Sequence, residues 1–187
     1  PALPVSIDAS ERNSLTQRAA IASVSMAVIL LGLKICAAWA TGSVSMLGSL
    51  ADTGLDIVAS LMTLYSVRIA AQPADGDHRF GHGKAEALAA LFQTGVITAS
   101  ALAIGWRGFS RIGDSAAPER PELGIAVSVV AILLTLALVL YQRSIVRRTG
   151  SIAIHADHVH YSSDLLLNGA VIVALVLDGV LSVRGAD

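Results

Sequence analysis

The stretch HADHVHYSSDLLLNGAVIVALVL, from His155 to Leu177, opens with three histidines and two aspartates and ends in a long apolar run. A run of this kind is typical of a helix that spans a membrane, which needs roughly 20 mostly apolar residues. Ionisable groups inside such a helix are costly and are usually kept for a function. The stretch therefore predicts a membrane protein with a polar site inside its bundle.

The whole chain has the composition of a membrane protein. Its 187 residues are 54% hydrophobic and 14% charged, and the mean hydropathy is +0.68, whereas a soluble domain has about 25% charged residues. We expect an all-α, polytopic transmembrane helix bundle with five helices, at about 16–40, 43–69, 84–112, 123–146 and 151–183. Residues 1–15 should form an N-terminal cytoplasmic segment, ahead of a transmembrane domain over 16–187.

Several classes of protein are excluded. A net charge of −1 without a basic cluster gives no electrostatic footprint for nucleic acid. The single cysteine, Cys36, allows neither a disulfide framework nor a thiolate zinc site, and we expect it to pack between helices. An intramembrane metalloprotease would need an H-E-x-x-H pattern for its zinc ligands and general base. The chain has no such pattern, so we do not expect an enzyme.

Basic residues in the connections predict the orientation, because cytoplasmic loops are enriched in lysine and arginine. With the N-terminus in the cytoplasm, the inner side carries Arg12, Arg18, Arg68, Arg79, Lys84, Arg143, Arg147 and Arg148, and the outer side Arg107, Arg111, Arg120 and Arg184. This excess favours a cytoplasmic N-terminus. Lys34, near the outer end of the first helix, is expected to extend its amine to the membrane surface.

Two pairs of ionisable residues lie inside predicted helices at a spacing of four. Asp52 and Asp56 share one face of the second helix, and His160 and Asp164 share one face of the fifth. At about 1.5 Å of rise per residue, each pair lies roughly 14 to 20 Å from its end of the span and therefore near mid-membrane. Three carboxylates and one imidazole form a four-ligand set that suits a divalent ion such as Zn²⁺. Polar residues that only pack the helices are the alternative.

A second group of candidate ligands lies in the connection between the second and third helices. The sequence DGDHRFGHGKAEA places Asp75, His78 and His82 where a turn could gather them on a metal ion. A solvated polar loop is the alternative reading. Asp157, His155 and His158, at the start of the fifth helix, could line an entry path, but we expect surface groups.

The chain resembles the cation diffusion facilitator family, particularly its bacterial zinc/proton antiporters. The resemblance is carried by GSVSMLGSLADTGLDIVAS, DHRFGHGKAEALAAL and HYSSDLLLNGA. It implies a transport site formed by Asp52, Asp56, His160 and Asp164. It also favours a second zinc site at Asp75, His78 and His82.

The resemblance also implies a homodimer in the inner (plasma) membrane that exchanges cytoplasmic metal for external protons by alternating access. The transported ion would be Zn²⁺, with Cd²⁺, Fe²⁺, Co²⁺ or Mn²⁺ as other candidates. A metal-conducting channel or a membrane metal sensor could use the same ligands and is the alternative function. Members of the family have a sixth helix and a cytoplasmic domain, so the printed chain is expected to be a fragment that stops before both.

Overall fold

The computed structural model describes residues 7–41, 45–110 and 121–181, and these form five helices. Their bounds are α1 Ala9–Thr41, α2 Ser45–Ala70, α3 Lys84–Ser110, α4 Pro121–Thr149 and α5 Ile152–Leu181. The prediction of an all-α bundle is confirmed. The predicted residues 43–44, 111–112 and 182–183 of these helices lie outside the described ranges.

Helix bounds differ from the prediction most clearly at the start of the chain. α1 begins at Ala9 rather than near Thr16, so part of the predicted N-terminal segment is helical. The added turns are polar, and contacts with other elements stabilise them: Arg12 pairs with Glu86 at 3.1 Å, and Arg148 pairs with Glu11 at 2.7 Å. Hydropathy alone could not find these turns, because they do not need to lie in lipid.

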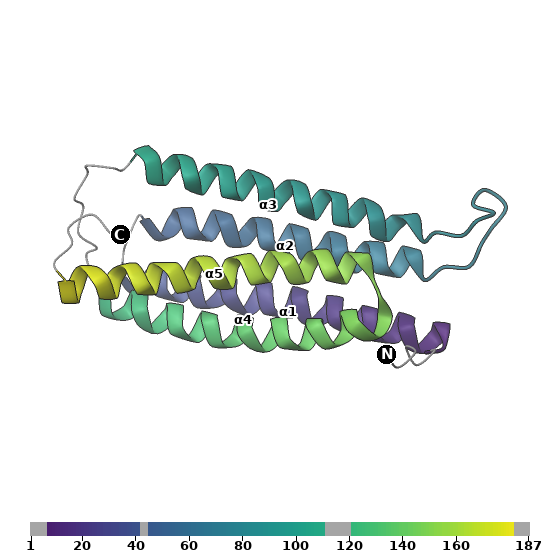
Figure 1. Ribbon diagram of the computed structural model, residues 1–187, viewed down its shortest axis with the longest axis horizontal. Coiled ribbons are helices and arrows are strands. Elements are labelled where there is room, and N and C mark those ends of the chain that lie inside the picture. The colour runs from purple at the N-terminus through teal and green to yellow at the C-terminus, as the bar shows by residue number, and fades with distance from the viewer. Residues whose placement is uncertain (1–6, 42–44, 111–120, 182–187) are drawn as a thin grey trace.

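The five helices run side by side along the bundle, and α5 contacts every other helix (Figure 1). α1 packs against α2 and α4, while α3 packs against α2 and α5. One end of the bundle, which we call the N-terminal end, contains the start of α1, the loop over residues 71–83 and the turn at Gly150. The opposite end is called the far end.

Four helices have a length and composition suited to crossing a membrane within the described residues. These stretches are Ala9–Ala40, Asp52–Ala70, Lys84–Trp106 and Val127–Thr149. α5 is as long, and its histidines and aspartates, apart from Asp178, lie in its first half. Large apolar side chains are exposed along α1 to α5, as expected for surfaces that face lipid. The chain is a multi-pass membrane protein.

The buried apolar core lies toward the N-terminal end. One cluster combines residues from all five helices: Ala19, Ala20, Val67, Ala89, Ile145, Ala153 and Ile154. A second, smaller cluster of Leu138, Val139 and Tyr161 joins α4 to α5. Small residues at these contacts allow close approach of the helices, which is how helices pack in membranes. This packing fixes the face that α5 turns toward α2.

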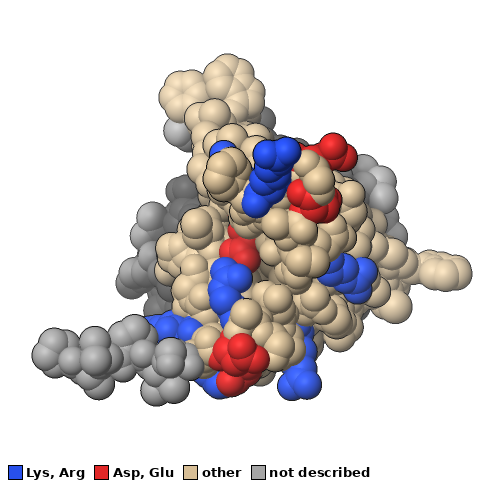
Figure 2. Space-filling model, turned by 90° about the vertical axis from the view of Figure 1, so that its right-hand side faces the viewer, with Lys and Arg blue, Asp and Glu red and all other residues tan. Residues whose placement is uncertain are grey.

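Charged side chains gather on the N-terminal end, as Figure 2 shows. Exposed members include Arg68, Arg79, Lys84, Arg143, Arg147 and Arg148. Glu86 is different, since it is buried and joins three elements. It accepts from Nη2 of Arg12 at 3.1 Å and from the Ser151 hydroxyl at 2.8 Å, and its Oε2 caps α5 at the Ile152 N–H at 3.1 Å. Glu86 is therefore a buried charged residue that connects α3 to α1 and to the start of α5.

Candidate metal site

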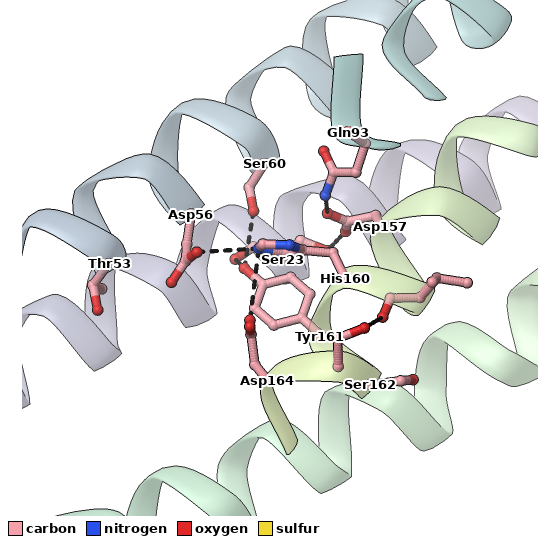
Figure 3. A network of polar contacts seen from close by, with 12 residues as sticks. Ser23, Thr53, Asp56, Ser60, Gln93, Asp157, His160, Tyr161, Ser162 and Asp164 are labelled. Atoms are coloured by element: carbon pink, nitrogen blue, oxygen red, sulfur yellow. Dashed lines mark hydrogen bonds and ion pairs between the residues drawn. The ribbon is translucent and has the colours of Figure 1, made fainter. Parts of the chain in front are cut away.

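Three ionisable side chains from α2 and α5 come together inside the bundle (Figure 3). Nε2 of His160 lies 3.1 Å from Oδ1 of Asp56 and 3.6 Å from Oδ2 of Asp164. Each residue offers one donor atom, and these atoms all lie within 4.8 Å of one another. We call Asp56, His160 and Asp164 the bundle cluster. Its oxygen and nitrogen donors are those that bind Zn²⁺ and related divalent ions.

Burial of the bundle cluster is uneven. The side chain of His160 is 4% exposed, whereas those of Asp56 and Asp164 are 22% and 32% exposed. Carboxylates withdrawn even partly from water are costly without a positive partner, so a site with two half-buried carboxylates favours either a cation or bound protons.

Asp52, the fourth predicted ligand, lies outside this group. It is on the same face of α2 as Asp56, about 6 Å further toward the far end, and it is exposed. The structure therefore brings together three of the four predicted residues and leaves Asp52 one helical turn away.

The local sequence explains why His160 and Asp164 point the same way. α5 follows Gly150, whose φ of 63° is in the left-handed region that favours glycine. The chain turns there, and four-residue spacing then puts both side chains on one face of α5. Next to them, the Tyr161 hydroxyl donates to the carbonyl of Ser23 at 3.1 Å and lies 2.9 Å from the Ser60 hydroxyl. These bonds fix α5 against α1 and α2 at the level of the cluster.

Asp157 was predicted to be a surface group, and this was wrong. It is fully buried and accepts hydrogen bonds from Ser23, Gln93 and Gln142. Its three neutral partners come from α1, α3 and α4, so the carboxylate is satisfied without a cation. Sequence reasoning missed both glutamines because it followed only ionisable residues. Amides inside apolar helices were the available signal, since such residues bond across helices.

Other residues of this region also lie differently from the prediction. Lys34 was expected to extend its amine to the membrane surface. Instead, its Nζ donates to Oγ1 of Thr53 on α2 at 2.6 Å. Cys36 is exposed rather than packed between helices. His155 is exposed, as expected, while His158 is half-buried. Lys34 thus brings a positive charge to α2 at Thr53.

The loop between α2 and α3 gathers the second set of predicted ligands. Oδ1 of Asp75 lies 3.2 Å from Nδ1 of His78, and Oδ2 lies 3.6 Å from Nε2 of His82. The centroids of the two imidazole rings are 4.4 Å apart. We call these three residues the loop cluster, and their donor atoms also fall within 4.8 Å of one another. Gly81, with a φ of 75°, makes the turn between the histidines.

The loop cluster is built around Asp75. The backbone N–H of His78 donates to Oδ1 of Asp75 at 2.6 Å, and the N–H of Asp77 donates to the same oxygen at 3.1 Å. The bond from the His78 backbone is the main reason that the pKa of Asp75 lies below its ordinary value. The carboxylate is therefore held in its ionised form, which is the form that binds metal.

The sequence is similar to known transport proteins over most of its length. A family model described as the cation efflux transmembrane domain matches residues 20–187. The cation-efflux pumps FieF of Yersinia pestis (strain Pestoides F) and Yersinia pseudotuberculosis serotype O:3 (strain YPIII) are each 50% identical over 159 residues. This region is 85% of the chain and 53% of each relative, so the chain spans about half the length of the curated relatives it matches.

Proposed function

The chain belongs to the cation efflux family, and from this premise we propose that it moves divalent metal ions out of the cytoplasm in exchange for protons. The observation that carries the proposal is the bundle cluster, in which one imidazole nitrogen faces two carboxylates from two helices. A transporter binds and releases its ion without changing it, so no catalytic residue is needed.

Zn²⁺ is the proposed cargo. Its usual site has four ligands in a tetrahedron, from histidine, aspartate and glutamate among others. Asp56, His160 and Asp164 supply three donors, and Asp52 is the proposed fourth because it lies one turn along the same face of α2. Cd²⁺, Fe²⁺, Co²⁺ and Mn²⁺ share some of these preferences.

Exchange with protons follows from the chemistry of the ligands. A metal ion needs ionised carboxylates and a neutral imidazole, so the same groups bind either the ion or protons. Histidine is the side chain whose ordinary pKa of about 6.5 lies closest to physiological pH. We propose that His160 carries one of the exchanged protons. Alternating access would then expose the bundle cluster first to one end of the bundle and then to the other.

The orientation and assembly are also proposals. The excess of basic residues at the N-terminal end supports a cytoplasmic location for that end. The protein would then lie in the inner (plasma) membrane with the loop cluster on the cytoplasmic side. The loop cluster is proposed to bind Zn²⁺ there and to raise its local concentration near the bundle. Family resemblance supports a homodimer.

Flux measurements on the complete natural protein in liposomes test the proposed function. We expect saturable Zn²⁺ movement that increases with an opposing pH gradient and stops when the gradient is collapsed. The matched control is the same protein with Asp56→Asn, which keeps the side-chain volume and removes the negative charge. Zn²⁺ movement that ignores the pH gradient would contradict proton exchange.

A metal channel or membrane metal sensor is the second candidate. Both could use the two clusters, but a channel needs binding weak enough for rapid exit. A fast current driven by voltage in the same liposomes would identify a channel. Tight binding without any flux would identify a sensor.

A further inference from the structure

Asp157 is a buried carboxylate that takes no part in the bundle cluster. It lies three positions before His160 on α5, about one helical turn toward the N-terminal end. Its Oδ2 accepts from the Ser23 hydroxyl at 2.5 Å and from Nε2 of Gln142 at 2.7 Å, and its Oδ1 accepts from Nε2 of Gln93 at 3.1 Å. We call these four residues the Asp157 cluster. Figure 3 labels three of them, Ser23, Gln93 and Asp157, beside the bundle cluster.

The Asp157 cluster ties together four helices. Ser23 is on α1, Gln93 on α3, Gln142 on α4 and Asp157 on α5, and all four side chains are fully buried. The amide of Gln142 also donates to the Ser23 hydroxyl at 2.9 Å. Neither glutamine has a hydrogen-bond partner for its side-chain oxygen among the described residues. Buried polar atoms are rarely left unpaired. The orientation of both amides toward Asp157 therefore costs free energy, because it leaves the two side-chain oxygens without a partner.

The Asp157 cluster is also where the tight packing of α3 ends. The buried side chains of α3 are Glu86, Ala89 and Gln93, which share one face, whereas the described side chains from 94 to 106 are half-buried or exposed. On α5, the buried run from Ser151 reaches Asp157 and then the ligand His160. The packed layer between the N-terminal end and the bundle cluster therefore finishes at the contact between Gln93 and Asp157.

A second group of buried polar contacts lies between the Asp157 cluster and the N-terminal end of the bundle. There Glu86 bonds to Arg12, Ser151 and the start of α5. An ion that moves along this contact from the N-terminal end toward His160 would pass Glu86 first and the Asp157 cluster last. The last layer holds no positive charge, since its three donors are a hydroxyl and two amides. Its bonds can break without separating an ion pair.

We propose that the Asp157 cluster is the gate that closes the N-terminal end of the bundle over the bundle cluster. Asp157 acts as a positioning residue, because it holds α1, α3 and α4 against α5 and ligates no metal itself. Access from the N-terminal end requires Gln93 and Gln142 to release its carboxylate. The proposal rests on the proposed transport function for its purpose, but its structural consequence can be measured without transport.

Accessibility from each side of the membrane tests the gate. The complete natural protein would carry Ser60→Cys as its single cysteine, with Cys36 and any cysteine beyond this chain replaced by serine. Ser60 is chosen because it is fully buried and its hydroxyl contacts Tyr161 beside the bundle cluster. The new thiol is labelled with a membrane-impermeant maleimide in liposomes of known orientation. Gln142→Met, which keeps the length of the side chain and removes its donors, is compared with Gln72→Met at an exposed position.

We expect Gln142→Met to speed labelling from the N-terminal side about five- to tenfold, as the loss of one or two hydrogen bonds would. Labelling from the far side should not increase, and Gln72→Met should change neither rate. Ser23→Ala is a second variant, with the same expected direction, in case Gln142→Met does not fold. Faster labelling from both sides would show a general loss of packing and overturn the gate, as would an unchanged rate from the N-terminal side.

The outcome separates this proposal from the transport proposal. Faster labelling from the N-terminal side alone supports the gate even if no Zn²⁺ flux is found in the parent protein. Normal Zn²⁺ flux with unchanged labelling in both Gln142→Met and Ser23→Ala rejects the gate and leaves the transport function standing.

Discussion

The Nε2 atom of His160 lies 3.1 Å from Oδ1 of Asp56, although the residues are 104 positions apart in the chain. Asp164 approaches the same nitrogen at 3.6 Å. A single imidazole nitrogen thus faces carboxylates from α2 and α5. A proton on this nitrogen would offset one of the two negative charges, and a divalent metal ion between the three groups would offset both.

Asp56→Asn and Asp164→Asn should each reduce Zn²⁺ flux at least about 100-fold. Loss of residues that only orient a ligand typically costs about 10 to 100-fold in affinity or activity, and loss of a ligand should cost more. The measurement is uptake into liposomes at matched protein content. Asp77→Asn is the control, since Asp77 is exposed and belongs to neither cluster. Normal flux in either ligand variant would remove that residue from the site.

Asp52 provides a test of the fourth ligand, because the structure leaves it one turn from the bundle cluster. If it joins the other three when Zn²⁺ binds, Asp52→Ala should lower Zn²⁺ affinity about as much as Asp56→Ala. Asp52→His should retain binding, since Zn²⁺ accepts two imidazoles with two carboxylates. Calorimetric titration compares the three variants. Equal affinities for the parent and Asp52→Ala would show that water or another residue completes the site.

Selectivity should depend on His160, the one nitrogen donor of the bundle cluster. Imidazole suits zinc and related ions, whereas a set made only of carboxylates suits harder ions such as Mn²⁺. His160→Asp should therefore weaken discrimination against Mn²⁺ by about tenfold or more, the effect of roughly 1.4 kcal/mol. Competition between Zn²⁺ and Mn²⁺ for uptake measures it. Should the variant exclude Mn²⁺ as well as the parent does, helix packing rather than the histidine sets selectivity.

The loop cluster should assist transport without being essential to it. Replacing His78 and His82 together with alanine removes two of its three donors and should raise the half-saturating Zn²⁺ concentration several-fold. The maximal rate should remain measurable, because the bundle cluster is untouched. Phe80→Ala is a matched control, since Phe80 is a fully exposed residue of the same loop. Complete loss of flux in the double variant would assign the loop cluster to the transport path itself.

Glu86 and Glu11 form a matched pair for stability, because both bond an arginine at the N-terminal end. Glu86 is 7% exposed in its side chain and Glu11 is 48% exposed. Glu86→Ala should lower the unfolding free energy by about 2–4 kcal/mol, since it leaves the Ser151 hydroxyl, the Ile152 N–H and Arg12 without their hydrogen-bond acceptor. Glu11→Ala should cost less than about 1 kcal/mol. Unfolding in a denaturing detergent compares them, and equal losses would contradict the buried role of Glu86.

Most of the fold could be predicted from the sequence. Apolar runs of sufficient length predicted all five helices, because a chain in lipid must pair its backbone groups within helices. Two features escaped this reasoning. The polar first turns of α1 depend on Glu86 and Arg148, which are far away in the chain, and the burial of Asp157 depends on helices that approach it from three directions.

The candidate ligands were also visible in the sequence, since spacing by four puts Asp52 with Asp56 and His160 with Asp164 on single helix faces. Periodicity determines which residues share a face, but not how two helices are rotated or shifted against each other. That relationship is decided by the packing of side chains around α5, among them Tyr161 against Ser60 and Asp157 against its glutamines. For this reason the sequence determined the helices and their polar faces, while only the tertiary structure decided that Asp56 and Asp164 meet at His160.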